Sequence, residues 1–314
     1  MPNGGFQLHW RQFQPWSLFI IMQKPVYFSS MILLVFAMLL WASSFIALKI
    51  AFENYSPMLV IWARMLIASI CFLVFIKQVM RFEYKAGDWK LLLVMAALEP
   101  CLYFILEAKA LQLTSASEAG MIASLSPLII AVLAYYMLDE NITRRQLSGF
   151  VISIAGVVAL SLGGEATEDA PNPLLGNFFE FLAMCCAAAY SVLLKRFSSR
   201  YSPMFLTAFP AFIGLLFFSL FVVIEPWPTQ VNWPSISAIL YLGACVTLGA
   251  YLCYNLAITK LPVTIAGAFI NLIPVFTLLL AWLILDEQLT SFQLLACGVV
   301  GVGLAISQTK KRRG

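Results

Sequence analysis

The sequence predicts an all-α integral membrane protein in which ten transmembrane helices form two inverted five-helix repeats. An apolar composition, ten apolar segments of membrane-spanning length and a long internal repeat together indicate this fold. Of the 314 residues, 62% are hydrophobic and only 11% are charged, and the mean hydropathy is +0.91. Soluble domains are roughly 45–50% apolar and about 25% charged. The chain therefore has too few polar side chains to cover a water-exposed surface.

Ten apolar segments reach the length of about 20 residues that an α-helix needs to cross a bilayer. They are residues 31–50, 57–77, 90–111, 117–138, 144–163, 175–195, 203–224, 235–258, 263–285 and 289–307. The connections between them are short, and several contain helix breakers, such as Ser56-Pro57 and Pro171-Asn172-Pro173. No connection is long enough for an extramembrane domain.

Residues 119–147 recur 147 positions later in the chain. The copies match Pro127 with Pro274, Asp139-Glu140 with Asp286-Glu287, Thr143 with Thr290, and Gln146 with Gln293. Lys49 and Pro57 also recur, 146 positions later, as Lys195 and Pro203. Along the whole chain, the first five predicted spans therefore align with the last five. Because five is an odd number, the second half is expected to lie inverted in the membrane. Inverted repeats are typical of secondary transporters, whose halves rock about a central site.

Positive charge predicts the orientation, because cytoplasmic loops of membrane proteins are rich in Lys and Arg. With a cytoplasmic N-terminus, all but three of the 19 Lys and Arg residues fall on the cytoplasmic side, the exceptions being Lys49, Arg64 and Lys109. We therefore expect a bacterial-type cytoplasmic (inner) membrane protein with both termini inside. Its predicted parts are an N-terminal cytoplasmic or interfacial arm (1–29), a first repeat (30–164), a periplasmic linker (165–174), a second, inverted repeat (175–307) and a basic cytoplasmic tail (308–314).

Several motifs resemble those of one transporter family. They are Trp41 to Ala47, Arg64, Glu107 to Ser117, Ser126-Pro127 and Leu138-Asp139-Glu140 in the first half, and Tyr254 to Ile258, Ile273-Pro274 and Leu285-Asp286-Glu287 in the second. Over residues 30–307 the chain resembles the ten-helix EamA-type branch of the drug/metabolite transporter superfamily. The resemblance implies an alternating-access exporter or permease for small metabolites, with a cavity lined by the first, third, fourth, sixth, eighth and ninth helices. Arg64 departs from the repeat, because Pro210 stands at the matching position.

Charged side chains within the predicted helices are the strongest site candidates, because a charge at the bilayer centre costs about 2.5–3.5 kcal/mol. Glu99 lies about 13 Å into its helix at about 1.5 Å per residue, just before the helix-weakening Pro100. Glu99 could bind a cationic group or a coupling proton, or it could serve packing alone. Arg64 could neutralise a substrate carboxylate. We favour a structural role for it instead, in which it pairs with Glu99, Glu107 or Glu118.

Other candidates lie nearer the helix ends or at helix kinks. Glu107 and Glu118 are expected to be ordinary interfacial charges, whereas Glu180 lies shallowly inside its helix and is a stronger candidate. Pro127 and Pro274 hold matched mid-helix positions, where proline removes a backbone donor and kinks the helix. They are candidates for gating, although prolines without that role are common in membrane helices.

A further group of side chains could supply an aromatic, hydrogen-bonding cavity. They are Trp41, Ser44, Tyr103, Tyr190, Tyr251, Tyr254, Asn255 and Asn271. Any single aromatic ring among them could equally serve packing, and Asn271 could be a simple link between helices. The group is therefore proposed as a set rather than residue by residue.

The sequence argues against several other classes of protein. Its single histidine, His9, lies in the N-terminal arm, and the seven cysteines show no metal-binding spacing, so neither a metal nor a cofactor is expected. No P-loop motif is present, so ATP-driven transport by this chain is not indicated. The basic tail fits contact with anionic lipid better than nucleic-acid binding.

We expect a secondary transporter that exports a small amino-acid-like or other organic metabolite, with proton exchange through Glu99 as the energy hypothesis and uniport as its rival. Its expected partners are the small-molecule substrate and the lipid bilayer, and it would act as a monomer or homodimer. A membrane-embedded lipid-modifying enzyme is an alternative, but no cluster of His, Asp or Cys supports it. A membrane assembly or receptor subunit without transport is a further alternative, against which the inverted repeat argues.

Overall fold

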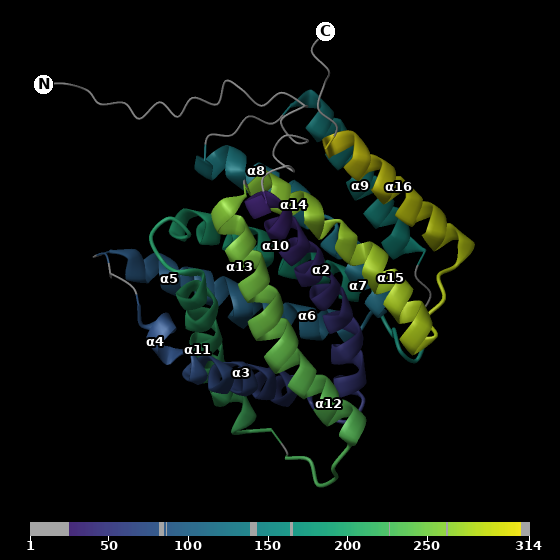
Figure 1. Cartoon of the computed structure of the whole chain (residues 1–314). Coiled ribbons are helices and arrows are strands. Elements are labelled where there is room, and N and C mark those ends of the chain that lie inside the picture. The colour runs from purple at the N-terminus through teal and green to yellow at the C-terminus, as the bar shows by residue number, and fades with distance from the viewer. Residues whose placement is uncertain are drawn as a thin grey trace, which may run out of the picture.

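The computed structural model describes residues 25–81, 85, 87–138, 143–163, 166–225, 227–261 and 263–308. Within these ranges every regular element is a helix, which confirms the all-α class (Figure 1). Eight helices there are long and apolar enough to cross a membrane, and two shorter apolar helices, Leu272–Leu285 and Ser291–Ile306, follow them. Ten full-length spans are therefore not seen. The ninth predicted span falls short because its helix is broken at Asn271.

Each half of the chain contributes a similar series of elements. The first half forms α2 (Pro25–Phe52), α3 (Pro57–Val74), the short α4 (Ile76–Val79), α5 (Asp88–Ala96), η1 (Ala97–Leu102), α6 (Tyr103–Leu111), α7 (Ala116–Ala123), α8 (Ser126–Leu138) and α9 (Arg144–Leu162). The second half forms α10 (Pro173–Phe197), α11 (Pro203–Val222), α12 (Trp233–Tyr241), η2 (Leu242–Ala250), α13 (Tyr251–Lys260), α14 (Val263–Ile270), α15 (Leu272–Leu285) and α16 (Ser291–Gln308). Helix α2 thus begins ahead of residue 30. Residues 1–24 of the predicted arm and 309–314 of the predicted tail lie outside the described residues.

Helices α3 and α11 begin in the same way at positions 146 residues apart. The hydroxyls of Ser56 and Ser202 cap the two helices by accepting a hydrogen bond from a backbone N–H of the first turn. Pro57 and Pro203 follow at the first helical positions, where the missing N–H has no intrahelical partner to lose. The repeat in the sequence is thus also a repeat in local structure.

The third and fourth membrane helices of each half are interrupted at matched places. The π-helical segments η1 and η2 divide the third helices. In η1 the cause is local, because Pro100 lacks an N–H and restricts Glu99 to extended backbone, with φ −145° and ψ 117°. The fourth helices break between α7 and α8 at Ser124-Leu125, and between α14 and α15 at Asn271. Such interruptions free backbone groups within the bundle.

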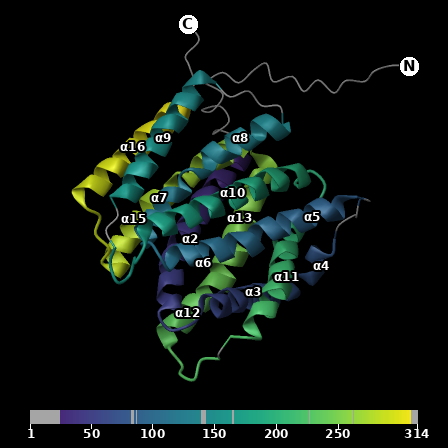
Figure 2. The same ribbon diagram turned by 180° about the vertical axis from the view of Figure 1, so that it is seen from behind.

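Contacts between the halves come in exchanged pairs (Figures 1 and 2). Helix α2 packs on α13 and α15, and its repeat counterpart α10 packs on α6 and α8. Helix α3 lies against η2, whereas α11 lies against η1. The matched helices α3 and α11 contact each other, as do α9 and α16. Matched elements of the two halves therefore make matched contacts with the other half.

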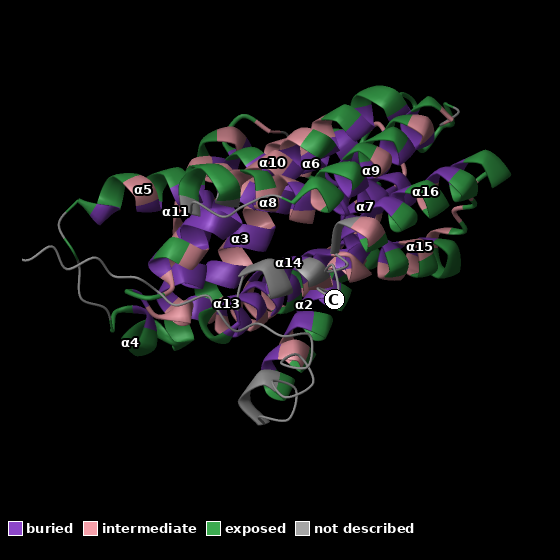
Figure 3. Ribbon diagram, turned by 90° about the horizontal axis from the view of Figure 1, so that it is seen from above, coloured by how far each residue is buried: buried purple, intermediate pink, exposed green. Residues whose placement is uncertain are grey.

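Burial separates the inside of the bundle from its perimeter (Figure 3). Many of the exposed side chains are large and apolar: Val74 is 78% exposed, Leu220 73% and Leu295 71%. So much exposed apolar surface is rare on soluble monomers. A perimeter of this kind is suited to contact with lipid, as expected for a multi-pass membrane protein.

Candidate functional site

A cavity lies where the two halves meet, and together with its open side it offers about 630 Å³ of space. Residues of α2, α3, η1, α6, α7, α8, α10, α13, α14 and α15 line it, and none of its lining residues comes from α9 or α16. These are the helices that the family resemblance implies, with α3 added through Arg64. Eight of the predicted site residues line the cavity: Trp41, Ser44, Arg64, Glu99, Tyr103, Tyr190, Tyr251 and Tyr254.

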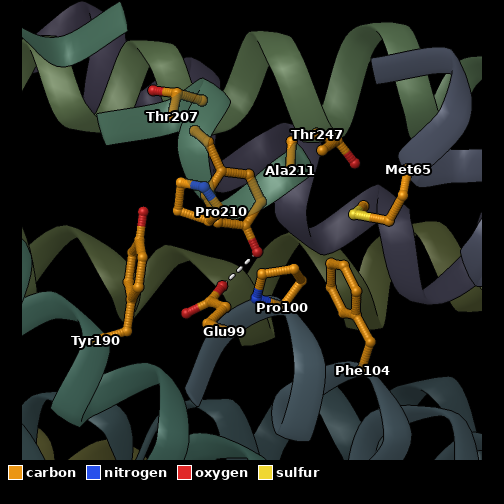
Figure 4. A pocket seen from close by; sticks show the side chains of 10 residues that line it. Met65, Glu99, Pro100, Phe104, Tyr190, Thr207, Pro210, Ala211 and Thr247 are labelled. Atoms are coloured by element: carbon orange, nitrogen blue, oxygen red, sulfur yellow. Dashed lines mark hydrogen bonds between the residues drawn. The ribbon is translucent and has the colours of Figure 1, made fainter. Parts of the chain in front are cut away.

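Glu99 lies where the cavity meets a smaller pocket with about 270 Å³ of space, shown in Figure 4. The extended backbone at Glu99 breaks the helix there. Its carboxylate is buried, and the Tyr251 hydroxyl donates a hydrogen bond to it, drawn as the dashed line in Figure 4. Pro100 and Tyr190 flank Glu99 in the same view. A local break enforced by proline thus presents an acid to two connected spaces.

Arg64 is buried and makes no ion pair with any carboxylate of the described residues. Its Nε donates to Thr247 Oγ1 at 2.7 Å, and its guanidinium carbon lies 4.2 Å from the centre of the Phe104 ring. Its Nη1 is buried without a hydrogen-bond partner. The expected pairing with Glu99, Glu107 or Glu118 is therefore not a salt bridge, although the Arg64 charge still acts on Glu99 and Glu107. The hydroxyl and the aromatic ring hold the guanidinium in place and leave one nitrogen without an acceptor.

Aromatic rings form a second wall of the cavity. The rings of Trp41 and Tyr251 have centroids 5.3 Å apart at an interplanar angle of 75°, and those of Trp41 and Tyr254 lie 5.0 Å apart. Tyr190 adds an edge-on contact with Tyr251 at 6.4 Å. Trp41 Nε1 is buried without an acceptor, while Ser44 Oγ donates to the Trp41 carbonyl at 2.6 Å. This wall offers ring faces together with an unused donor.

Glu107 is a cavity residue that the sequence reasoning placed among the interfacial charges. It is 3% exposed, lines the cavity and accepts a hydrogen bond of 2.7 Å from the Tyr103 hydroxyl. The signal was present, because Tyr103 and Glu107 are four residues apart and so share one helix face. Phe104 and Thr247, which hold Arg64, were also missed. An apolar ring and a small hydroxyl carry no distinctive sequence signal.

Five predicted site residues do not line the cavity. Asn255 Nδ2 donates to Thr207 Oγ1 at 2.8 Å, so it links helices. Asn271 marks the break between α14 and α15. Pro127 and Pro274 lie in the first turns of α8 and α15, directly after the helix breaks, where proline is well tolerated. Glu180 is fully buried near the cavity, with neither carboxylate oxygen hydrogen-bonded.

Glu118 belongs to a separate buried cluster of polar side chains. Its carboxylate accepts hydrogen bonds from Asn177 at 2.5 Å, Gln293 at 2.8 Å and Thr114 at 3.3 Å. These contacts join α7, α10 and the start of α16. Glu118 is therefore a buried link between helices, not the interfacial charge that we expected.

The described residues contain no group of three or more His, Cys, Asp or Glu side chains arranged to hold a metal ion. The cavity instead combines one guanidinium, two carboxylates and several aromatic rings within an apolar bundle. These features define a multi-pass membrane protein with a polar and aromatic cavity among its helices.

The chain belongs to the EamA-like transporter family, whose profile matches residues 28–162 and again 174–309. It is 28% identical over 286 residues to the uncharacterized transporter YetK of Bacillus subtilis, covering 88% of this chain and 86% of that protein. It is 26% identical over 279 residues to an S-adenosylmethionine/S-adenosylhomocysteine transporter of Chlamydia muridarum, covering 84% and 86%. The protein is therefore a membrane transporter and not an enzyme.

A solved structure described only as a crystal structure of a protein has a similar fold. Its TM-score is 0.65 at 21% identity, over 89% of this chain and 96% of that one. This likeness concerns the fold alone.

Proposed function

We propose that the protein is a secondary transporter of the cytoplasmic membrane that exports a small amino-acid-like metabolite by alternating access. One observation carries the proposal: a buried cavity holds Arg64, with an unpartnered nitrogen, together with the carboxylates of Glu99 and Glu107. Arg64 interacts electrostatically with both carboxylates but forms no salt bridge with either, and burying charges that are not directly paired is costly. A ligand with a carboxylate and an ammonium group would pair with both kinds of charge, its carboxylate with the guanidinium and its ammonium group with a cavity carboxylate.

The side chains suggest how such a zwitterion would bind. A guanidinium suits a carboxylate, because its planar array of donors matches the two oxygens. Glu99 or Glu107 would receive the ammonium group. The rings of Trp41 and Tyr254 would cover the apolar remainder of the substrate. Because one chain supplies all of these groups, a monomer is sufficient for transport.

The proposed architecture is ten spans in two inverted repeats, 30–164 and 175–307, joined by a periplasmic linker at 165–174, with both termini cytoplasmic. The matched helix caps, the matched interruptions and the exchanged contacts support it. The interrupted third and fourth helices of both halves border the cavity. Rocking of one repeat against the other would then open the cavity to one side of the membrane at a time.

We propose that export is driven by proton exchange at Glu99. A carboxylate in an apolar cavity can hold either a proton or the substrate's ammonium group, but not both. Binding of one therefore releases the other. The Tyr251 hydroxyl, which donates to Glu99, would orient the carboxylate in both states.

A second candidate substrate class is S-adenosylmethionine and its relatives, which the Chlamydia relative is named for. The cavity wall carries two carboxylates against one guanidinium, which favours a substrate with more positive than negative charge. A sulfonium linked to an amino acid and a flat adenine ring has this charge and would find ring faces at Trp41 and Tyr254.

Counterflow in liposomes tests the proposal. Liposomes that contain the purified chain would be loaded with one unlabelled compound at a time, from a panel of amino acids, S-adenosylmethionine and S-adenosylhomocysteine. Uptake of the labelled form of that compound would then be measured. We expect exchange of at least one zwitterion, and loss of its pH dependence in Glu99→Gln but not in the control Glu168→Gln, which alters an exposed acid. No exchange of any compound would contradict the proposal, and unchanged pH dependence in Glu99→Gln would exclude coupling there.

A further inference from the structure

Glu180 is the most unusual charged side chain of the described bundle. It lies on α10 and is 0% exposed, and neither of its carboxylate oxygens has a hydrogen-bond partner. No cation of the described residues forms a salt bridge with it. It does not line the substrate cavity, so the proposed site does not account for it.

Helix α6 carries two titratable side chains that interact with Glu180. It packs extensively on α10, and the charges of Glu107 and Glu180 are close enough to repel each other. Tyr103 also interacts electrostatically with Glu107 and Glu180, and its hydroxyl donates a hydrogen bond to Glu107. Glu107 in turn lines the cavity. Glu180 therefore lies close enough to interact with a cavity residue without lining the cavity itself.

The other titratable groups nearby do not neutralise Glu180. Lys109, on α6, is exposed, and its Nζ lies 5.6 Å from the centre of the Phe179 ring. Glu118, on α7, is hydrogen-bonded to Asn177, one turn before Glu180 on α10. Glu99, in η1, accepts its hydrogen bond from Tyr251 on α13.

The Arg64 guanidinium acts on Glu107, so that carboxylate has a counter-charge. The charge acting on Glu180 is the like charge of Glu107, and no cation of the described residues forms a salt bridge with it. A buried carboxylate in that position does not stay ionised without a counter-charge. An unpaired ionised carboxylate in an apolar bundle would carry a desolvation cost far larger than the net contribution of a typical hydrogen bond. A bound proton removes that charge without needing any space. No metal-binding group of three ligands is present among the described residues, so a multivalent cation lacks its ligands there.

We propose that Glu180 is a second proton-binding site, outside the lining of the substrate cavity and coupled to it by electrostatic interaction with Glu107 and Tyr103. The proton adds to one carboxylate oxygen of Glu180, giving a neutral carboxylic acid, and leaves as a hydrated proton, so no electrons are exchanged. The inference rests on the proposed transport function, which it deepens by adding to the proton exchanged at Glu99 a second proton that is bound apart from the substrate. Substrate bound at Glu107 would then alter the charge that Glu180 experiences.

The first test needs no substrate. Infrared difference spectra of the purified full chain in lipid, recorded between mildly acidic and mildly alkaline buffer, report the C=O stretch of protonated carboxyl groups. We expect a titrating band that disappears in both Glu180→Gln and Glu180→Met, remains in the control Glu168→Gln, and shifts in Glu107→Gln. Glu180→Met is included because an apolar side chain of similar volume is well tolerated in place of a buried charge.

Two spectral results would overturn the inference. The first is that none of the pH-dependent bands of the wild type is lost in the Glu180 variants. Glu180 would then be permanently protonated or permanently ionised. The other is a band that titrates equally in wild type and both Glu180 variants. A sodium-dependent band would also overturn it, since the site would then hold a metal cation.

Transport assays separate this inference from the proposed function. Glu180→Gln is expected to keep counterflow, which needs no driving force, and to lose accumulation driven by a pH difference. Accumulation retained in Glu180→Gln would overturn the inference and leave the transporter proposal standing. Counterflow absent in wild type, with the Glu180 band present, would overturn the transporter proposal and leave the proton site standing.

Discussion

Arg200 and Asn54 occupy matching positions of the repeat, 146 residues apart, and each makes an equivalent contact with the other half of the molecule. Arg200 Nη1 donates to both carboxylate oxygens of Asp88 at 2.9 and 3.1 Å, joining the α10–α11 connection to the start of α5. Asn54 Nδ2 donates to Ser235 Oγ at 3.2 Å, joining the α2–α3 connection to the first turn of α12. Asp88 and Ser235 are themselves repeat counterparts. One contact is an ion pair and the other is neutral.

A tyrosine makes a further hydrogen bond near each of these contacts, to Asp88 itself in the first case and to Asn232 in the second. The Tyr201 hydroxyl donates to Asp88 Oδ2 at 3.1 Å, and the matched Tyr55 hydroxyl accepts a hydrogen bond of 2.9 Å from Asn232 N. We refer to the pair Asp88–Arg200 with Tyr201 as the charged latch, and to Asn54–Ser235 with Tyr55 as the neutral latch. In an inverted repeat the two latches would face opposite sides of the membrane. Alternating access would then require each to open in turn.

The first prediction concerns the charged latch. Salt screens ion pairs, with a Debye length of about 10 Å at 0.1 M, so the wild-type counterflow rate should rise with ionic strength as this latch weakens. Asp88→Asn should remove that dependence, and Ser235→Ala, in the neutral latch, should keep it. Because the Arg200 side chain is 37% exposed, the pair is expected to contribute at most about 1 kcal/mol. Equal salt dependence in wild type and Asp88→Asn would show that the ion pair does not limit the rate.

The second prediction concerns Glu287, one of the repeated acidic residues. Its two carboxylate oxygens accept hydrogen bonds of 2.9 Å from the backbone N–H groups of Ala116 and Ser117, the first turn of α7. Helix N-termini favour such negative acceptors. Glu287→Ala should therefore lower the free energy of unfolding by about 1 kcal/mol, measured by thermal unfolding in detergent.

Asp286→Asn is the matched control for this substitution. Asp286 ends α15 with φ 54°, a left-handed conformation that asparagine adopts readily. The melting temperature of the Asp286→Asn variant should match that of wild type. A melting temperature of Glu287→Ala equal to that of Asp286→Asn would exclude the cap as a stabilising contact.

The acidic repeat also shows how far sequence reasoning reached. The match of Glu140 with Glu287 revealed the duplication, because a polar pattern in one register has no other simple cause. It did not reveal that Glu287 caps a helix of the other half, since the partner of a side chain depends on packing between distant segments. Glu99 was found because composition alone marks a charge deep in an apolar segment. Glu107 was misjudged because depth counted along the chain does not report which way a helix face points.

Glycines in α16 provide the third prediction, with a control in the same helix. A Cβ at Gly303 would collide with backbone atoms of Ser153 and Gly149 on α9, whereas one at Gly298 would meet nothing within 4 Å. Gly303→Ala should therefore separate α9 from α16 and destabilise the chain by about 1–3 kcal/mol. Gly298→Ala should be neutral or stabilising by up to about 1 kcal/mol, because alanine favours helix. Thermal unfolding of the two variants checks this, and equal destabilisation of both would contradict close packing at Gly303.

The fourth prediction tests Thr247 as a positioning residue for Arg64. Thr247 Oγ1 accepts the hydrogen bond from Arg64 Nε and donates its own proton to the Leu242 carbonyl at 2.9 Å. Thr247→Val keeps the shape and removes the hydroxyl, so the guanidinium loses a fixed partner. A hydrogen bond to a charged group contributes about 1.5–3 kcal/mol, which corresponds to a rise in KM of roughly ten- to hundredfold.

The choice of ligand separates positioning from general damage to the cavity. Thr247→Val should raise KM for a transported zwitterion and leave KM nearly unchanged for the matching amine that lacks a carboxylate, with the maximal rate of both little affected. Thr247→Ser, which keeps the hydroxyl, should behave as wild type for both compounds. If Thr247→Val raised KM equally for the zwitterion and the amine, the Arg64 guanidinium would not be the group that receives the carboxylate. The orientation of the substrate in the cavity would then have to be reversed.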